Sequence, residues 1–170
     1  MRPRVHESCY VHPSAVIIGN VTIHENCGIW PNAVIRGDED SIVIGAGSNV
    51  QDCCVLHVTG GHPARIGKNV SIGHGSTVHG ATIEDDVIVG MNAVLMNGVS
   101  IGSGSIIGAN AVVKLGTTVP PGSLVVGIPG KIIKEGDERL REEALINAET
   151  YRRLAEEHKS GMYRQHASKD

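Results

Sequence analysis

The stretch ATIEDDVIVGMNAVLMNGVSIGSGSIIGANAVV, residues 81–113, decides the fold, because an aliphatic residue recurs in it at every sixth position. A small or β-branched residue stands two places before each of these positions, which are Ile83, Val89, Leu95, Ile101, Ile107 and Val113. In a strand, residues two apart share a face, so both members of each pair point to the same side. A period of six matches neither a 3.6-residue helix nor a heptad, and it predicts short strands joined by tight corners.

The same period extends along most of the chain. It continues downstream through Val119 and Val125, and upstream it includes Val11, Ile17, Ile23, Ile29, Ile35, Ile44, Val50, Leu56, Ile66, Ile72 and Val78. Three hexads make one triangular coil, and stacked coils form a parallel β-helix whose bore is too narrow for Phe. The composition agrees, with no Phe, one Trp and 22 Gly in 170 residues. We therefore predict an all-β solenoid, a parallel β-helix of hexapeptide repeats.

A helical pattern replaces the hexads after Pro121. One face of an amphipathic helix is predicted to carry Leu140, Ala144, Leu145, Ala148, Tyr151, Leu154 and Ala155, with Asp137 as its N-cap. We expect a β-helix domain over residues 1–136, a C-terminal helix over 137–158 and a frayed tail over 159–170. The apolar face of the helix has two candidate partners, the solenoid of its own chain and a neighbouring chain.

The composition also bears on partners and compartment. The net charge of −3 comes from mixed signs without a basic stripe, so we expect no nucleic-acid partner. No apolar run is long enough to span a bilayer and the first residues lead into no apolar signal segment, so we expect no membrane association. The four cysteines, Cys9, Cys27, Cys53 and Cys54, lack paired CxxC spacing and are expected to be free thiols of a cytoplasmic protein.

Two histidines stack when the hexads are counted in threes. The outward column of the second face reads Arg36, His57, His79 and Met96 on successive coils. Because neighbouring coils are about 4.8 Å apart, His57 and His79 are close enough to bind one metal ion. His74 lies around a corner, beside Asp52 of the adjacent coil, so it can complete such a site only from another chain. A head-to-tail contact of this kind closes into a ring, and the triangular prism suggests a homotrimer.

Three histidines and one open position form the arrangement of catalytic zinc, which lowers the pKa of bound water to about 7. Hydroxide is then available at neutral pH, and a small electrophile such as carbon dioxide needs no further cofactor. His62 is the only nearby titratable candidate for a proton shuttle. Imidazole also suits other metals, so Fe²⁺ and Co²⁺ remain alternatives to Zn²⁺.

Further residues gather around this expected site. Gln51 is placed to hydrogen-bond a metal-bound oxygen, and Arg36 and Asp52 are expected to face each other across the subunit interface. Asp38 is expected to hold Arg36 or a backbone amide. Two insertions, residues 37–42 and 57–64, interrupt the hexads at the same level and are expected to wall a pocket. A brace between subunits is the simpler role for Arg36 and Asp52, and helix packing is the simpler role for Tyr151.

The chain resembles the γ-class carbonic anhydrase family of left-handed β-helix proteins. The matching motifs are Arg36-Gly37-Asp38, Gln51-Asp52 followed by His57, and Gly73-His74-Gly75 followed by His79-Gly80. The resemblance implies left-handed coils and a homotrimer that binds carbon dioxide and bicarbonate, with the metal held by His57 and His79 of one chain and His74 of the next. It also implies that Gln51 orients bound hydroxide or bicarbonate, that Arg36, Asp38 and Asp52 sustain the interface and the pocket, and that Tyr151 closes over the site.

One segment departs from the family pattern. Well-studied active members carry a longer acidic loop with a glutamate proton shuttle, whereas residues 58–63 here are short and contain no acid. Two other functions therefore stand beside a zinc-dependent carbonic anhydrase. One is an acyl-CoA thioesterase or acyltransferase on the same scaffold, and the other is a weakly active metal-binding or assembly protein.

Overall fold

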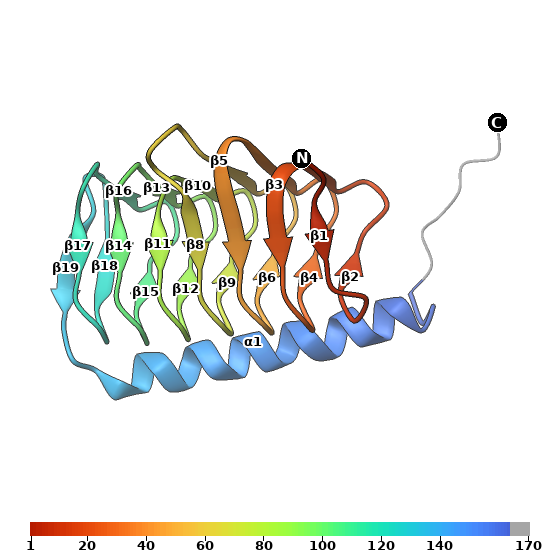
Figure 1. Cartoon of the computed structure of the whole chain (residues 1–170). Coiled ribbons are helices and arrows are strands. Elements are labelled where there is room, and N and C mark those ends of the chain that lie inside the picture. Colours follow the sequence, from red (N-terminus) through yellow and green to blue (C-terminus); the bar gives the residue numbers. More distant parts are fainter. Residues whose placement is uncertain (164–170) are drawn as a thin grey trace, which may run out of the picture.

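Three faces of short strands, stacked coil upon coil, form the body of the molecule (Figure 1). The structure is a computed structural model and describes residues 1–163. Neighbouring coils pair in parallel and in register, so each residue lies beside its equivalent in the next coil. The predicted parallel β-helix with a C-terminal helix is thereby confirmed.

The first face is one sheet that ends in an antiparallel strand. Its strands are β2 (Tyr10–Val11), β4 (Gly28–Ile29), β6 (Asn49–Val50), β9 (Ser71–Ile72), β12 (Ile88–Val89), β15 (Ile106–Ile107), β18 (Leu124–Val126) and β19 (Lys131–Lys134). After β18 the chain reverses at residues 127–130, and β19 pairs with β18, so it covers the open edge of the last coil.

The second and third faces belong to a single sheet because two long strands pass from one to the other. These are β3 (Val16–Ile23) and β5 (Val34–Ile44). The second face continues with β7 (Val55–His57), β10 (Thr77–His79), β13 (Val94–Leu95) and β16 (Val112–Val113). The third face holds β1 (Arg4–Val5), β8 (Ala64–Ile66), β11 (Thr82–Ile83), β14 (Ser100–Ile101) and β17 (Thr118–Val119).

Two features of these faces differ from the predicted hexads. Pairing passes from Gly19 opposite Gly37 to Val21 opposite Ile42, so the first insertion lies within β5 as a bulged strand instead of a free loop. The ladder contacts on both sides of the bulge keep the strand continuous. The repeat also begins one hexad earlier than Val11, because β1 pairs in parallel with the end of β3.

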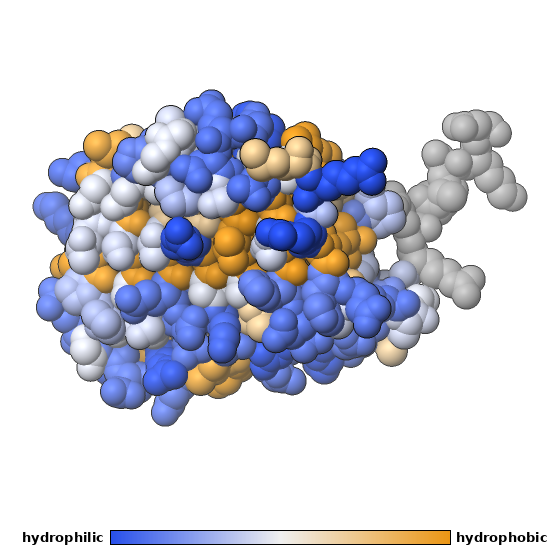
Figure 2. Space-filling model, in the orientation of Figure 1, coloured by the Kyte–Doolittle hydropathy of each residue, from blue (hydrophilic) through white to orange (hydrophobic). Residues whose placement is uncertain are grey.

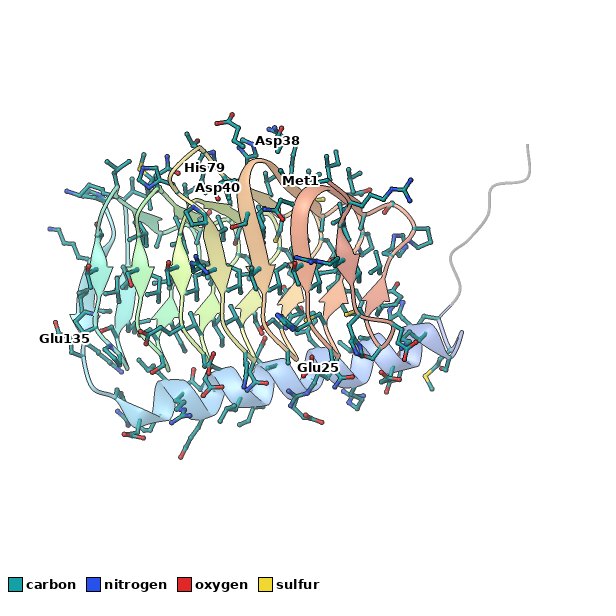
Figure 3. The ribbon with its side chains drawn as sticks, viewed as in Figure 1. Met1, Glu25, Asp38, Asp40, His79 and Glu135 are labelled. Atoms are coloured by element: carbon teal, nitrogen blue, oxygen red, sulfur yellow. The ribbon has the colours of Figure 1, made fainter. Side chains whose placement is uncertain are left out.

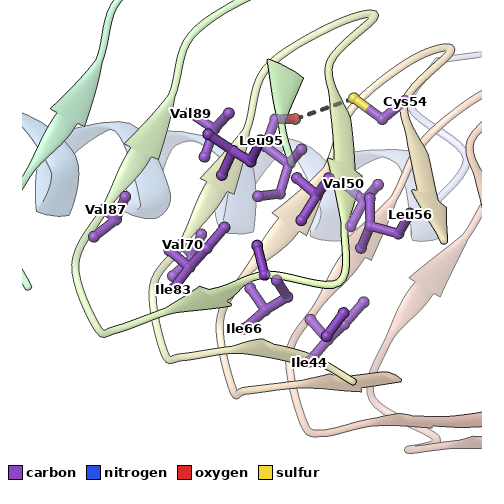
Figure 4. Packing of buried hydrophobic residues seen from close by; sticks show 14 of the residues in the cluster. Ile44, Val50, Cys54, Leu56, Ile66, Val70, Ile83, Val87, Val89 and Leu95 are labelled. Carbon is purple, nitrogen blue, oxygen red and sulfur yellow. Dashed lines mark hydrogen bonds between the residues drawn. The ribbon is translucent and has the colours of Figure 1, made fainter. Parts of the chain in front are cut away.

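The bore is filled by the aliphatic series (Figure 4). Ile35, Leu56 and Leu95 are fully buried, and no inward position on the coils exceeds Ile or Leu in size. Cys27 and Cys54 occupy small inward positions and are buried. Burial of this aliphatic area, at about 25 cal/mol per Å², is the main stabilising contribution in a chain so poor in aromatic residues.

The helix α1 (Glu138–Lys159) lies along the first face (Figure 1). Asp137 is its N-cap and accepts a hydrogen bond from the backbone N–H of Arg139. The buried strip consists of Leu140, Ala144, Ala148 and Ala155. Leu145, predicted on this strip, is 39% exposed, because close approach of helix and sheet admits only a narrow row of mostly small residues. Of the two candidate partners for the helix, its own solenoid is therefore correct.

Two long-range contacts fix the helix on the solenoid. Arg141 Nε donates to Asp86 Oδ2 at 2.8 Å, and Asp86 is almost completely buried. Arg152 Nη1 donates to Asn69 Oδ1 at 2.8 Å. Hydrophilic residues cover most of the solvent side of the helix (Figure 2). Within residues 1–163, no helix has the length and apolar character needed to cross a membrane.

Candidate functional site

His57 and His79 lie side by side on the second face, in the register that the repeat predicts. His57 Nδ1 and His79 Nε2 are 3.0 Å apart, and the two rings meet edge to face at 67°. Figure 3 places His79 and Asp38 on the rim of the solenoid opposite α1. The stacking follows from β7 and β10 being paired strands of adjacent coils, with both histidines at the residue after the buried aliphatic one.

Each of these imidazoles is held at its other nitrogen. His79 Nδ1 donates to Asn97 Oδ1 at 2.6 Å, and His57 Nε2 donates to Asp38 Oδ1 at 3.0 Å. Acceptors therefore stand at both ends of the chain of groups from Asp38 to Asn97. The contact between His57 Nδ1 and His79 Nε2 therefore joins two imidazoles whose outer nitrogens are both already held.

His74 lies at the first-face corner, on the side of the solenoid that carries α1. Its Nδ1 donates to Asp52 Oδ2 at 2.8 Å, in the coil below, as the register predicts. Because Nδ1 carries the hydrogen, Nε2 is an acceptor, and the Tyr151 hydroxyl donates to it at 3.1 Å. The His74 side chain is 45% exposed, so this imidazole faces outward from the chain that carries it.

Gln51 is buried beside His74 and its amide is largely used. Its Oε1 accepts from the backbone N–H of His74 at 3.2 Å, and its Nε2 donates to Asn49 Oδ1 at 3.0 Å. Asn49 in turn donates to Ser71 Oγ at 2.9 Å. An amide nitrogen carries two hydrogens, so one N–H of Gln51 remains for another acceptor.

Glycines flank the histidines for a steric reason. Gly75 has φ +70°, and a Cβ at this position would lie 2.3 Å from Asn92 Oδ1 of the next coil. Gly80 has φ +56°, and a Cβ there would lie 2.5 Å from Asn97 Oδ1, the acceptor of His79. The GHGSTVHG stretch, residues 73–80, therefore turns a tight corner between two histidines that face different ways.

Arg36 and Asp38 form an ion pair at the rim. The hydrogen bonds from Arg36 and then from His57 lower the pKa of the Asp38 carboxyl. This agrees with the prediction that Asp38 holds Arg36. Within the chain Asp52 binds His74 instead of Arg36, so the contact expected between Arg36 and Asp52 across an interface stays a prediction.

The two insertions contact each other. Asp40 of the first accepts from the backbone N–H of Gly61 in the second at 3.1 Å. His62, which pairs with Thr59 across the tip of that loop, is exposed and approaches Gly80 at the corner. The loops thus form one rim beside His79, and His62 remains a candidate for proton transfer only by its position.

Tyr151 combines both roles weighed for it in the sequence. Its ring packs edge to face on Trp30, with centroids 5.7 Å apart, while its hydroxyl reaches His74. Burial, followed by the charge of Asp52, raises the pKa of the Tyr151 hydroxyl. A cavity of about 250 Å³ opens here between α1 and the first face, lined in part by His74, Met91 and Asn147.

Three residues of this region were not predicted from the sequence. Asn97 orients His79, Asn49 fixes Gln51, and Asp40 joins the two loops. Asn97 directly follows Met96, the last residue of the histidine column, and extending the column by one position is the signal that would have found it. Asn49 and Asp40 act through side-chain rotamers, which the repeat does not specify.

Two of the expected histidines fit as ligands of one metal ion. Within residues 1–163 of one chain, no three His, Cys, Asp or Glu side chains converge as a metal site. Two of the expected ligands do converge, because nitrogens bound to one tetrahedral Zn²⁺ lie roughly 3.3 Å apart, close to the 3.0 Å here. In all three histidines, the N–H on the second ring nitrogen also donates a hydrogen bond to a side-chain oxygen, as it almost always does in metal-bound histidines.

Comparison with known proteins agrees with this fold. The profile of the bacterial transferase hexapeptide family (six repeats) matches residues 2–37 and 80–114. A probable carbonic anhydrase from Methanocaldococcus jannaschii is 48% identical over 152 residues, 89% of this chain and 96% of that protein. The carnitine operon protein CaiE of Salmonella agona is 36% identical over 94% of this chain and 81% of its own.

A solved structure is also similar. The crystal structure of a hexapeptide transferase family protein from Anaplasma phagocytophilum has a TM-score of 0.86 and 34% identity, with 91% of each chain covered. Fold and repeats thus define a left-handed β-helix protein of the hexapeptide class. Within that class, the chain belongs to the γ-class carbonic anhydrase family. The relatives show that this scaffold also serves proteins with other names and functions.

Proposed function

We propose that the protein is a metal-dependent carbonic anhydrase that hydrates carbon dioxide to bicarbonate and works as a homotrimer. The observation that carries the proposal is the pair of oriented imidazoles, His57 and His79, with nitrogens 3.0 Å apart on an outward face. In the proposed trimer, His74 of a neighbouring protomer completes the ligand set. The 48% identity to a probable carbonic anhydrase supports the same reaction.

The second face has the character of a subunit interface. Immediately before the buried aliphatic residues, its strands present an in-register outward column of Val16, Val34, Val55, Thr77, Val94 and Val112. Val16 and Val55 are 42% and 39% exposed. The equivalent column of the third face contains one valine, Val43, among Thr, Arg and Ser. An apolar stripe beside the histidines, on a face that α1 does not cover, favours burial against a second copy.

The residues of this chain have distinct roles in the proposed site. His57, His79 and a neighbouring His74 would hold the ion through their imidazole nitrogens. Zn²⁺ held by three imidazoles with one open position supplies a nucleophile from water at neutral pH. Asn97, Asp38 and Asp52 would fix the imidazole orientations. The free N–H of Gln51 would orient a substrate oxygen. The Tyr151 hydroxyl would give up its hydrogen bond to His74 Nε2, so that this nitrogen can bind the ion.

Metal content and chain mixing test the ligand set. We expect about one divalent ion per chain, lost in His57→Ala, His79→Ala and equally in His74→Ala. Mixing His74→Ala with His57→Ala subunits should restore metal binding at some interfaces, since each variant carries what the other lacks. Mixed trimers that bind no metal would refute a site shared between chains.

Stopped-flow hydration of carbon dioxide tests the reaction. The protein is purified anaerobically and compared with Zn²⁺, Co²⁺ and Fe²⁺, and His57→Ala serves as the matched control. A metal-dependent rate that His57→Ala abolishes supports the proposal. No rate above buffer with any of the three metals would refute carbonic anhydrase activity while leaving the metal site itself intact.

A second candidate is chemistry on an acyl-CoA, either hydrolysis or acyl transfer. The cavity of about 250 Å³ beside His74 and the resemblance to a hexapeptide transferase family protein favour it. Release of free thiol from acyl-CoA by the same preparations measures this activity. If neither reaction occurs and the trimer binds metal, the remaining proposal is a metal-binding or assembly protein.

A further inference from the structure

Two cysteines lie in adjacent coils at the N-terminal end of the solenoid. Tyr10 of β2 and Gly28 of β4 are paired in register, and Cys9 and Cys27 are the residues directly before them. Both cysteines occupy the inward small position of their coil. Neighbouring parallel strands are about 4.8 Å apart, and the Cα atoms of disulfide-bonded cysteines are usually 4.4–6.8 Å apart. The backbone therefore already has a separation that a disulfide bond can span.

The two thiols differ in burial and in the direction in which their pKa is shifted. Cys27 is buried, whereas Cys9 is partly exposed because β2 is the edge strand of its sheet. The sulfur of Cys9 is close enough to Cys27 for its pKa to be lowered by the Cys27 thiol and backbone N–H, with His6 and Lys159 adding positive charge. The same contact raises the pKa of Cys27. Cys9 Sγ donates to the His24 carbonyl at 3.0 Å and Cys27 Sγ donates to the Gly45 carbonyl at 3.2 Å, so both are thiols in this arrangement. The lowered pKa makes Cys9 the more readily deprotonated of two adjacent thiols.

We propose that Cys9 and Cys27 form a redox-active dithiol, which a low-molecular-weight disulfide such as oxidised glutathione converts to an intramolecular disulfide. The Cys9 thiolate attacks one glutathione sulfur, a mixed disulfide forms and one glutathione thiolate leaves. Cys27 then loses its proton and attacks the Cys9 sulfur, and the second glutathione thiolate leaves. Two protein thiols are oxidised, one glutathione disulfide is reduced, and the two protons end on the two glutathione molecules.

The disulfide would tie the first coil to the second. Within residues 1–163, β4 is the only strand that pairs with β2, so one side of β2 makes no sheet contact. Lys159 Nζ also donates to the Ser8 carbonyl at 2.8 Å, so the end of α1 rests on the turn before Cys9. Oxidation would therefore fasten the end of the solenoid on which the last turn of the helix is seated.

The other two cysteines provide an internal contrast. Cys53 and Cys54 are adjacent in sequence, but Cys53 is exposed at a corner with φ 59°, whereas Cys54 is buried. Burial raises the pKa of the Cys54 thiol to about 11. Cys53→Asn removes the competing exposed thiol with little strain, because Asn26 and Asn32 adopt the same left-handed conformation at other corners.

The experiment uses the full chain carrying Cys53→Asn, which leaves three of the four cysteines. After equilibration with oxidised glutathione at pH 7.5, acid quenching and alkylation in denaturant, we expect free thiols to fall from three to one. Mass spectrometry should identify a peptide pair linked through Cys9 and Cys27, which dithiothreitol restores to two thiols. A second chain with Cys27→Ser should hold glutathione at Cys9, and one with Cys9→Ser should leave Cys27 unmodified.

Three results would overturn the proposal. One is that all three thiols stay free while glutathione disulfide is in excess. Another is that Cys9 keeps glutathione although Cys27 is present, and the third is that the bond forms only in denaturant. The disulfide is measured in the Cys53→Asn chain, which retains both Cys9 and Cys27. This measurement tests the proposal even if a serine variant fails to fold.

Discussion

Replacing Asn97 with alanine should lower the affinity of the proposed site for Zn²⁺ by about 10–100-fold, the usual effect of losing the hydrogen-bond partner of a metal-bound histidine. This corresponds to roughly 1.4–2.8 kcal/mol. His79 Nδ1 donates to Asn97 Oδ1 at 2.6 Å, and this bond keeps the hydrogen on Nδ1 and the lone pair on Nε2. Free choice between the two tautomers contributes only about a factor of two. Most of the loss in affinity should therefore come from the His79 ring, which is no longer held in the orientation that the ion requires.

The position suits a clean substitution. Asn97 is partly buried, and the left-handed corner residue is the following Gly98, so alanine introduces no backbone strain. Leu115→Ala is a matched control, because Leu115 lies in the same column one coil further and is exposed. Asn97→Asp keeps an acceptor at the same place and should retain or increase the affinity.

Competition with a chromophoric chelator measures the Zn²⁺ affinity of all three variants, at one chain concentration and with the trimer checked by light scattering. The reasoning is refuted if Asn97→Ala binds within twofold of the parent while Leu115→Ala is unchanged. It is also refuted if Asn97→Asp and Asn97→Ala lose the same amount, since the acceptor would then be irrelevant.

Three further predictions concern assembly and stability. Val55→Asp should convert the trimer to monomers, seen by light scattering, because it places a charge in the apolar column, whereas Arg65→Asp on the third face should leave the trimer intact. Leu56→Ala should lower the free energy of unfolding by about 2–5 kcal/mol in urea, because the fully buried side chain lies in a bore that cannot collapse. Burial raises the pKa of Cys54 to about 11 from 9.0, so folding favours the protonated thiol. That contribution is complete below pH 9 and should decline as pH rises from 9 toward 11, a decline that Cys54→Ala removes.

Each of these has a contrary outcome. A Val55→Asp chain that still elutes as a trimer would mean that another face makes the interface. A loss below about 1 kcal/mol for Leu56→Ala would mean that the coils relax into the space. Identical pH profiles for the parent chain and Cys54→Ala would show that ionisation of this thiol is not linked to unfolding.

The register of the solenoid was predictable because two periods act together. The strand period of two fixes which residues point inward, and the period of six fixes which coil they join, so His57 beside His79 and His74 above Asp52 follow by counting. The paired strands confirm both placements. The same counting could not foresee the continuous β5, because the bulge after Gly37 keeps strand pairing that an insertion usually interrupts.

The helix and the hydrogen bonds around the site were harder to predict. Periodicity identifies an apolar helix face but not its partner, and Leu145 shows that it overestimates the width of that face. Two contacts hold the helix on its own solenoid, Arg141 with Asp86 and Arg152 with Asn69. Their partners are 55 and 83 residues apart in sequence, and no sequence pattern connects them. Asn97 was missed for a similar reason, since its role depends on a rotamer that meets His79 from the next coil.

The corner between His74 and His79 links metal binding to assembly under the proposed arrangement. His79 follows His74 by five positions, and the left-handed Gly75 turns the chain between them, so one imidazole lies at the first-face corner and the other on the second face. No rotamer brings them to one ion within a chain. Metal affinity and trimer stability are then a single linked equilibrium, because the ion binds the assembled interface and not the separate chains. The apparent metal affinity should therefore rise with chain concentration.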